Sequence, residues 1–197
     1  MHFKIHSLFD FHKKNNLQKM IIYFIRHTSV DVPKGICYGR TDVPLAATFK
    51  EEATNVAKQI KGIEFDAVYS SPLSRALKLA DFCGFEEPIV DARISEFNFG
   101  EWEMKSFDSL YNEDPRFRIW CEGNYIKTSA PGGESFADQM ARFEKFIQEK
   151  KEQGNKTIAA FCHGGILACA LIYSGKATAD KAFDSVPPYG SVISIEV

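Results

Sequence analysis

The stretch IIYFIRHTSV, residues 21–30, places five consecutive apolar or aromatic residues directly before an arginine and a histidine. An apolar run of this length is typical of a strand that is buried on both faces of a sheet. A buried charge is costly unless it is paired, so Arg26 and His27 are poor residues for extending such a strand into a core. The stretch therefore predicts a buried strand over 21–25 that delivers a guanidinium and an imidazole to a site at its end.

Strand-like and helix-like segments alternate along the rest of the chain. Further strands are expected at 65–70, 88–91, 157–162 and 191–197, and helices at 49–61, 71–83, 134–152 and 164–173, whereas residues 100–130 are expected to be irregular. In the second helix, Ser71 suits the N-cap and Pro72 the first helical position. This alternation predicts a three-layer α/β/α sandwich around a mostly parallel central sheet.

Cationic and imidazole side chains follow three of these strands. In sheets of this kind, ligands bind beyond the carboxyl ends of the strands. Arg26 and His27 follow the first strand, Arg75 lies just inside the helix after the second, and His163 directly follows the strand at 157–162. We therefore expect these four side chains to meet at one edge of the sheet.

Two arginines and two histidines at one edge suit a phosphate group. The planar guanidinium matches phosphate oxygens, and a neutral imidazole is a competent nucleophile toward phosphorus. Neighbouring guanidinium groups should lower the pKa of His27 and keep it unprotonated.

A phosphoryl transfer also needs an acid for the leaving oxygen, and Glu96 is the candidate. The apolar residues Phe97, Phe99 and Trp102 would favour its protonated form. Glu101 and Glu103 are the alternative carboxylates, and both are equally consistent with simple surface charge.

Composition limits the other classes of function. A net charge of −2 gives no electrostatic case for nucleic acid or an anionic membrane, and no apolar run is long enough to span a bilayer. The five cysteines form no CxxC pair, which argues against a zinc site or a disulfide framework and for reduced thiols in a cytoplasm. Residues 1–19 are expected to be a peripheral extension, of the kind that a non-native start codon placed too early would add. A single domain is expected over residues 20–197.

Four motifs, RHT, SSPLSRA, SEFNFGEWE and FCHGG, occur in this order and resemble those of the histidine phosphatase superfamily, which has the phosphoglycerate mutase-like fold. The resemblance covers roughly residues 20–197. It implies that Arg26 and Arg75 bind the phosphoryl oxygens, that His27 becomes phosphohistidine and that His163 hydrogen-bonds the transferring group. Glu96 would protonate the leaving group and then activate water. No metal and no cofactor are implied.

The loop after the first strand departs from the commonest family pattern. Thr28, Ser29 and Val30 replace the usual Gly, Glu and Ser or Thr, and Pro33 stands about where an asparagine is common. Ser29, or a backbone N–H of this loop, is the expected substitute as a phosphate contact. Later in the chain, Met104 replaces the glycine of the usual Trp-Glu-Gly.

Tyr38 and Gly39 match a family position where the backbone meets phosphate or substrate, and the stretch YGRTD is equally consistent with a plain turn. The loop RHTSVDVPKGICYGRTDVPL around them resembles that of bacterial α-ribazole phosphatases, which act on α-ribazole 5′-phosphate in cobalamin nucleotide-loop assembly. Phe99 stands where phosphoglycerate mutases carry a tyrosine, and the short segment between Glu96 and His163 also favours a small phosphatase.

These features predict a metal-independent phosphomonoesterase with a small phosphorylated substrate. It is expected to be a monomer or homodimer, with a small cap at about 100–133. A mutase-like or broad sugar-phosphate phosphatase is the alternative. A non-catalytic relative that binds phosphorylated ligands ranks last, because such a relative would be expected to lose His27 or Glu96.

Overall fold

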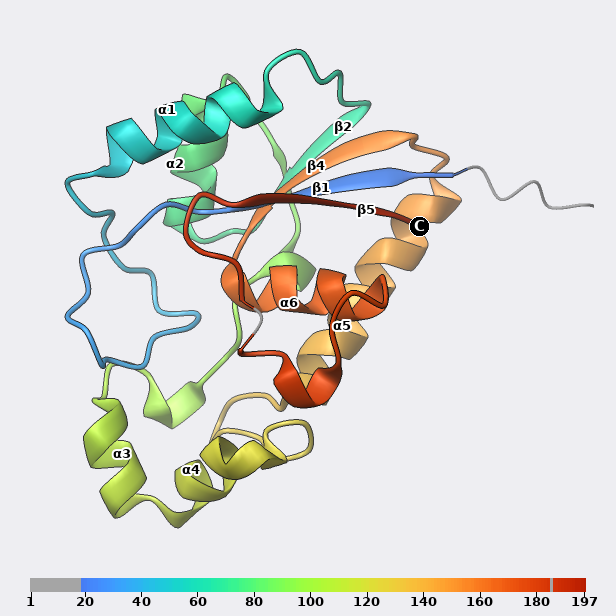
Figure 1. Ribbon diagram of the computed structural model, residues 1–197. Coiled ribbons are helices and arrows are strands. Elements are labelled where there is room, and N and C mark those ends of the chain that lie inside the picture. Colours follow the sequence, from blue (N-terminus) through green and yellow to red (C-terminus); the bar gives the residue numbers. More distant parts are fainter. Residues whose placement is uncertain (1–18, 185) are drawn as a thin grey trace, which may run out of the picture.

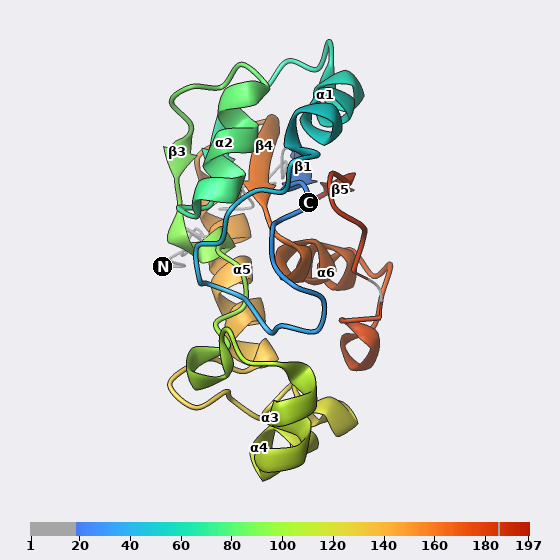
Figure 2. The same ribbon diagram turned by 90° about the vertical axis from the view of Figure 1, so that its left-hand side faces the viewer.

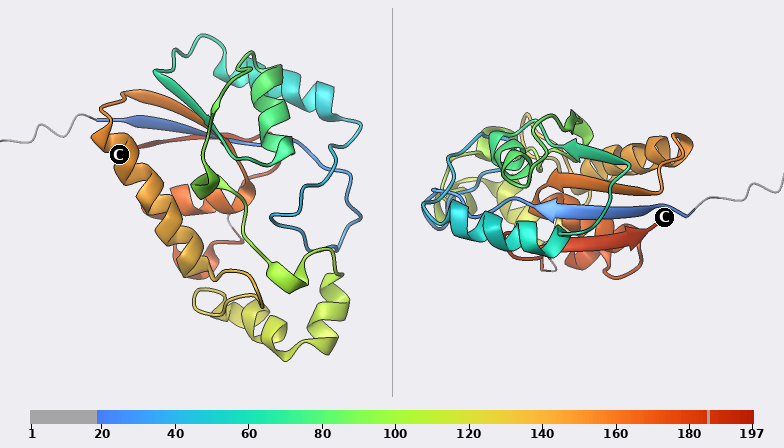
Figure 3. Two further views of the ribbon diagram at one scale, coloured as in Figure 1. Left: turned by 180° about the vertical axis from the view of Figure 1, so that it is seen from behind. Right: turned by 90° about the horizontal axis from the view of Figure 1, so that it is seen from above.

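A five-stranded sheet forms the centre of the molecule (Figure 1). The computed structural model describes residues 19–184 and 186–197, so the expected N-terminal extension lies outside the described residues apart from Lys19. The strands are β1 (Ile21–Arg26), β2 (Ala67–Ser70), β3 (Ile89–Val90), β4 (Thr157–Cys162) and β5 (Val192–Glu196), in the spatial order β3-β2-β4-β1-β5. Only β5 runs antiparallel to its neighbour, as the view from above shows (Figure 3), so the expectation of a mostly parallel sheet is confirmed.

Helices cover both faces of the sheet. Helices α1 (Phe49–Ile60) and α2 (Ser74–Phe82) lie on one face, and α5 (Phe136–Glu152) and α6 (Gly164–Tyr173) lie on the other (Figures 1 and 2). Side chains of a strand alternate between the two faces, so β1 contributes to both cores. Ile22 and Phe24 pack with α5 and α6, whereas Ile25 packs with α1 and α2. The predicted three-layer architecture is confirmed.

The second helix starts later than its capping signal predicts. Helix α2 begins at Ser74, and Ser71 is not its N-cap. The backbone N–H of Ser71 donates to the Phe161 carbonyl at 2.9 Å, which continues the pairing of β2 with β4. Because this hydrogen bond ties the backbone of Ser71 to β4, the helix forms only after Pro72.

The segment expected to be irregular contains several short helices. They are a 3₁₀ turn at Gly100–Trp102, α3 (Phe107–Glu113), α4 (Pro115–Ile119) and a π-type turn at Trp120–Asn124. Figures 1 and 2 show α3 and α4 together at the end of the molecule opposite α1. Buried aromatic residues hold them together, and the Trp102 indole N–H donates to the Asp114 carboxylate at 2.7 Å.

Met104 has a backbone conformation that favours glycine. Its φ is 62°, in the left-handed region that glycine adopts without strain, which explains in physical terms why a glycine is usual at this position.

Within the described part of the chain, no helix is both long enough and apolar enough to cross a bilayer.

Candidate active site

The pairing of β1 with β4 sets the spacing of the two histidines. These strands are parallel, with Arg26 opposite Cys162, and the His27 N–H donates to the Cys162 carbonyl at 3.0 Å. His27 and His163 therefore leave the sheet at the same level, with their ring centroids 5.1 Å apart. The structure thus brings together the ends of the first and fourth strands, as the sequence predicts.

Hydrogen bonds fix the tautomer of His27. Its Nδ1 lies 2.7 Å from the Thr28 carbonyl oxygen, which can only accept, so Nδ1 carries the proton. The lone pair of Nε2 accepts from the Arg75 Nε–H at 3.3 Å. Burial, and then the Arg75 guanidinium, hold the pKa of His27 well below its usual value. The ring is therefore neutral near pH 7, with an unprotonated Nε2.

Arg75 is fully buried and is held by backbone carbonyls. Its terminal nitrogens donate to the Gly39 carbonyl at 2.6 Å and to the Thr41 carbonyl at 2.9 Å. The Nε–H of Arg75 donates to His27. Each terminal nitrogen therefore keeps one N–H without a hydrogen-bond partner among the described residues, and these two N–H groups can donate to the oxygens of a ligand. Gly39 must be glycine here, because a Cβ would lie 2.0 Å from the Phe97 carbonyl oxygen.

Arg26 precedes His27 in the chain and packs against an aromatic ring. Its guanidinium carbon lies 4.2 Å from the centroid of the Tyr189 ring, and its Nη1 donates to the Pro187 carbonyl. The Nε of Arg26 is buried and has no hydrogen-bond partner in the described residues. Tyr189 also shares a hydrogen bond with Tyr38, so the two tyrosines meet over the arginines.

His163 is fully buried, and its Nε2 lies 2.7 Å from the Ser71 hydroxyl. Its Nδ1 is also buried, with no partner in the described part of the chain. Ser71 is a site residue that the sequence analysis missed, because its position before a helix suggested a cap. The available signal was that Ser71 directly follows β2 at the same sheet edge.

Glu96 reaches this edge from the segment between β3 and α5. Its Oε1 accepts from the Phe97 N–H at 2.8 Å, and both carboxylate oxygens lie 3.2–3.3 Å from the Gly165 N–H at the start of α6. The Gln139 side chain donates to the same carboxylate at 3.5 Å. Gly165 allows this approach, since a Cβ there would lie 2.4 Å from Glu96 Oε1.

A pocket of about 230 Å³ contains Arg26 and Glu96. The rest of its lining is largely apolar and aromatic: Ile36, Tyr38, Phe97, Phe99, Phe107, Phe183, Val186 and Tyr189, with Gly164 and Gly165. Phe97 and Phe99 thus form the wall that the sequence predicts beside Glu96. Trp102 does not contribute to the lining and packs instead against Phe117 and Trp120.

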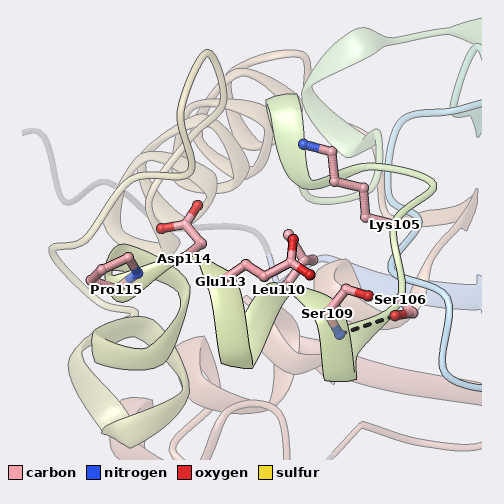
Figure 4. Close-up of a pocket in the computed structure, with 7 residues that line it drawn as sticks. All are labelled: Lys105, Ser106, Ser109, Leu110, Glu113, Asp114 and Pro115. Atoms are coloured by element: carbon pink, nitrogen blue, oxygen red, sulfur yellow. Dashed lines mark hydrogen bonds between the residues drawn. The ribbon is translucent and has the colours of Figure 1, made fainter.

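A larger pocket, of about 520 Å³, lies on α3 (Figure 4). Its lining comprises Lys105, Ser106, Ser109, Leu110, Glu113, Asp114 and Pro115, and includes none of the predicted site residues. The smaller pocket is therefore the candidate active site, because Arg26, Tyr38 and Glu96 line it. His27, Arg75 and His163 are not part of its lining, but His27 and Arg75 lie against the lining residues Tyr189 and Tyr38.

The backbone N–H of Ser29 is occupied within the protein. It donates to the Glu52 carboxylate at 2.8 Å. A phosphate contact from Ser29 would therefore have to come from its hydroxyl. Over residues 19–184 and 186–197, no group of three or more metal-ligating side chains is found.

The fold and the site together define a class: an α/β protein that presents two arginines and two histidines beside an apolar pocket, as the handling of a phosphate ester requires. The chain belongs to the histidine phosphatase superfamily (branch 1), whose family model matches residues 22–197. It is a phosphoric monoester hydrolase.

Similar proteins carry names of several phosphatases. The adenosylcobalamin/α-ribazole phosphatase of Escherichia coli K12 is 30% identical over 160 residues, which is 77% of each chain. Phosphoserine phosphatase 1 of Hydrogenobacter thermophilus is 30% identical over 161 residues, covering 77% of this chain and 75% of the relative. The α-ribazole phosphatase structure from Shigella flexneri superposes with a TM-score of 0.81 at 26% identity, covering 90% of this chain and 91% of that one. These relatives do not distinguish between substrates.

The two buried histidines predict a stability that depends on pH. Burial, as the main cause, holds the pKa of both His27 and His163 well below 6.5. As pH falls below about 6.5, the unfolded chain binds protons that the folded chain does not, so stability is lost toward acid. Each histidine should contribute a slope of up to about 1.4 kcal/mol per pH unit.

Urea unfolding of the wild type and of His163→Gln, measured from pH 5 to pH 8, tests this expectation. The free energy of unfolding of the wild type should rise steeply up to about pH 6.5, and the variant should show a shallower rise. An equal slope in both proteins would contradict a neutral, buried His163.

Proposed function

We propose that this chain hydrolyses phosphomonoesters through a phosphohistidine at His27. Nε2 of His27 gives up its hydrogen bond from the Arg75 Nε–H and attacks phosphorus, the ester bond to the leaving oxygen breaks, and Glu96 gives that oxygen a proton. Water then attacks the phosphohistidine, Glu96 takes its proton, and phosphate leaves as Nε2 regains its lone pair. The lone pair on Nε2 and the proton on Nδ1 support this assignment.

Three side chains would hold the phosphoryl group in this scheme. Arg26 and Arg75 supply the positive charge, which makes a metal ion unnecessary for the step. The Ser71 hydroxyl accepts from the Leu73 N–H, so its own proton can go to His163 Nε2. His163 Nδ1 would then carry a proton and donate it in a hydrogen bond to a phosphoryl oxygen.

The preferred substrate that we propose is α-ribazole 5′-phosphate, and the pocket lining is the observation that carries this choice. Aromatic and aliphatic side chains surround the space beside Glu96, and Arg26 is the one cationic side chain among the described residues that line this pocket. A flat, uncharged aromatic base can stack on such a lining. A leaving group with a carboxylate, such as serine or glycerate, would find no second cation there and would lose its hydration.

The test compares kcat/KM of chelator-treated protein on α-ribazole 5′-phosphate, phosphoserine, 3-phosphoglycerate and glucose 6-phosphate. We expect a preference for α-ribazole 5′-phosphate of at least about tenfold. Phe107→Ala should lower kcat/KM for this substrate and leave that for phosphoserine unchanged. Highest activity on phosphoserine or phosphoglycerate, or a requirement for added metal, would sink the proposal.

A further inference from the structure

The sequence suggested that Glu103 is either an alternative acid to Glu96 or a simple surface charge, and its contacts fit neither role. Its Oε1 accepts from the Arg40 N–H at 2.8 Å and from the Phe99 N–H at 3.2 Å. Its Oε2 accepts from the Thr41 N–H at 2.5 Å and from the Thr41 hydroxyl. Four donors already occupy the two oxygens of this carboxylate, so it is no rival to Glu96 as acid, and four hydrogen bonds are more than a surface charge would make.

The loop that Glu103 binds is also the loop that holds Arg75. The Gly39 carbonyl, which accepts from Arg75, and the Arg40 N–H, which donates to Glu103, belong to the same peptide group. A single peptide group therefore joins the carboxylate to the guanidinium. A carboxylate on the N–H side polarises the peptide and makes its oxygen a stronger acceptor, because hydrogen bonds in a chain reinforce one another.

This arrangement differs from a direct ion pair in one important respect. A carboxylate bound directly to Arg75 would occupy the N–H groups that a phosphate needs. Within the described residues, the carboxylate that pairs with Arg75 is that of Asp42, at 4.0 Å, and its side chain is 51% exposed. Glu103 restrains Arg75 from the far side of a peptide group, so the two remaining N–H groups stay available.

We propose that Glu103 is a positioning residue for Arg75: it fixes residues 39–41 so that their carbonyls aim the guanidinium at the phosphoryl group. The inference rests on the proposed function, which assigns Arg75 to that group. Sites that bind charged groups depend on such supporting contacts, and losing one commonly costs ten- to a hundredfold in affinity at metal sites.

Binding of orthovanadate, a phosphate analogue, to the full-length protein tests this role without any turnover. Glu103→Gln keeps the size of the side chain but turns an amide NH₂ toward backbone N–H and hydroxyl donors, so we expect vanadate to bind on the order of tenfold more weakly. Glu101→Gln is the matched control, because Glu101 is a neighbouring, exposed glutamate. It should bind vanadate as the wild type does.

A double-mutant cycle with Arg75→Ala separates positioning from a general structural role. If Glu103 acts through Arg75, then Glu103→Gln should weaken vanadate binding little further once Arg75 is absent. Equal losses in both backgrounds, or normal vanadate binding by Glu103→Gln, would overturn the inference. If Arg75→Ala itself binds vanadate normally, then the proposed function fails as well, which distinguishes the two failures.

Should Glu103→Gln not fold, Thr41→Val provides the second test. This variant removes the hydroxyl that donates to Glu103 and keeps the backbone N–H. It should weaken vanadate binding by a smaller factor, again only when Arg75 is present. An effect of the same size with and without Arg75 would overturn the inference.

Discussion

His27→Ala is expected to lower kcat by about 10⁴-fold or more and to abolish the covalent phosphoenzyme. The expectation follows from the loss of the nucleophilic Nε2, since removing a nucleophile commonly costs this much while substrate binding persists. The measurement is labelling with a radioactive substrate followed by an alkaline quench, because phosphohistidine is labile in acid and stable in alkali. Unfolding curves should show that the variant still folds.

The neighbouring histidine provides the control for this experiment. His163 lies 5.1 Å from His27 between ring centroids, so a histidine label alone would not identify the nucleophile. His163→Ala should lower the rate of labelling and still form the alkali-stable phosphoprotein. A label that persists in His27→Ala, or one lost only in His163→Ala, would refute the assignment of the nucleophile.

Glu96→Gln is expected to slow the first step by about 10²–10⁴-fold on alkyl phosphates and far less on p-nitrophenyl phosphate. A nitrophenolate leaves without a proton, whereas an alkoxide needs one. The second step also uses Glu96, so the variant should release one equivalent of nitrophenol in a burst and then stall as phosphoenzyme. Rapid-mixing measurement of the burst separates the two steps, which a steady-state rate would merge.

Glu101→Gln is the control, and it should behave as the wild type with both substrates. Equal losses in the first step on alkyl and aryl phosphates would remove Glu96 as the general acid. Absence of a burst, together with normal labelling, would show that another group activates water.

The fold could be predicted to a large extent from local patterns. The strands leading to Arg26 and His163 are short apolar runs, and the long helices are marked by capping residues or by apolar residues, so local patterns placed them, with the start of α2 as the exception. Helices α3 and α4 were missed because they have seven and five residues, too few for a periodic pattern. Their capping residues, Ser106 and Asp114, were the signals available.

The site was predictable where a residue follows a strand and not where its partner lies far away in the sequence. His27 and His163 could be placed from strand ends alone. Ser71 bonds to His163 across 92 residues, and Glu103 reaches Thr41 across 62. Such contacts depend on how loops fold back over the sheet, which no local pattern records. The Glu52 contact that occupies the Ser29 N–H is of the same kind.

The pairing of Arg26 with Cys162 limits how the sequence of such a protein can evolve. The distance between the two histidines depends on how many residues each strand contributes, and only weakly on which residues these are. Successive side chains of a strand point to opposite faces, so inserting or deleting one residue in β4 would turn His163 away from His27. Apolar residues in β1 and β4 can be exchanged for others, whereas the lengths of these strands are fixed by the chemistry at their ends.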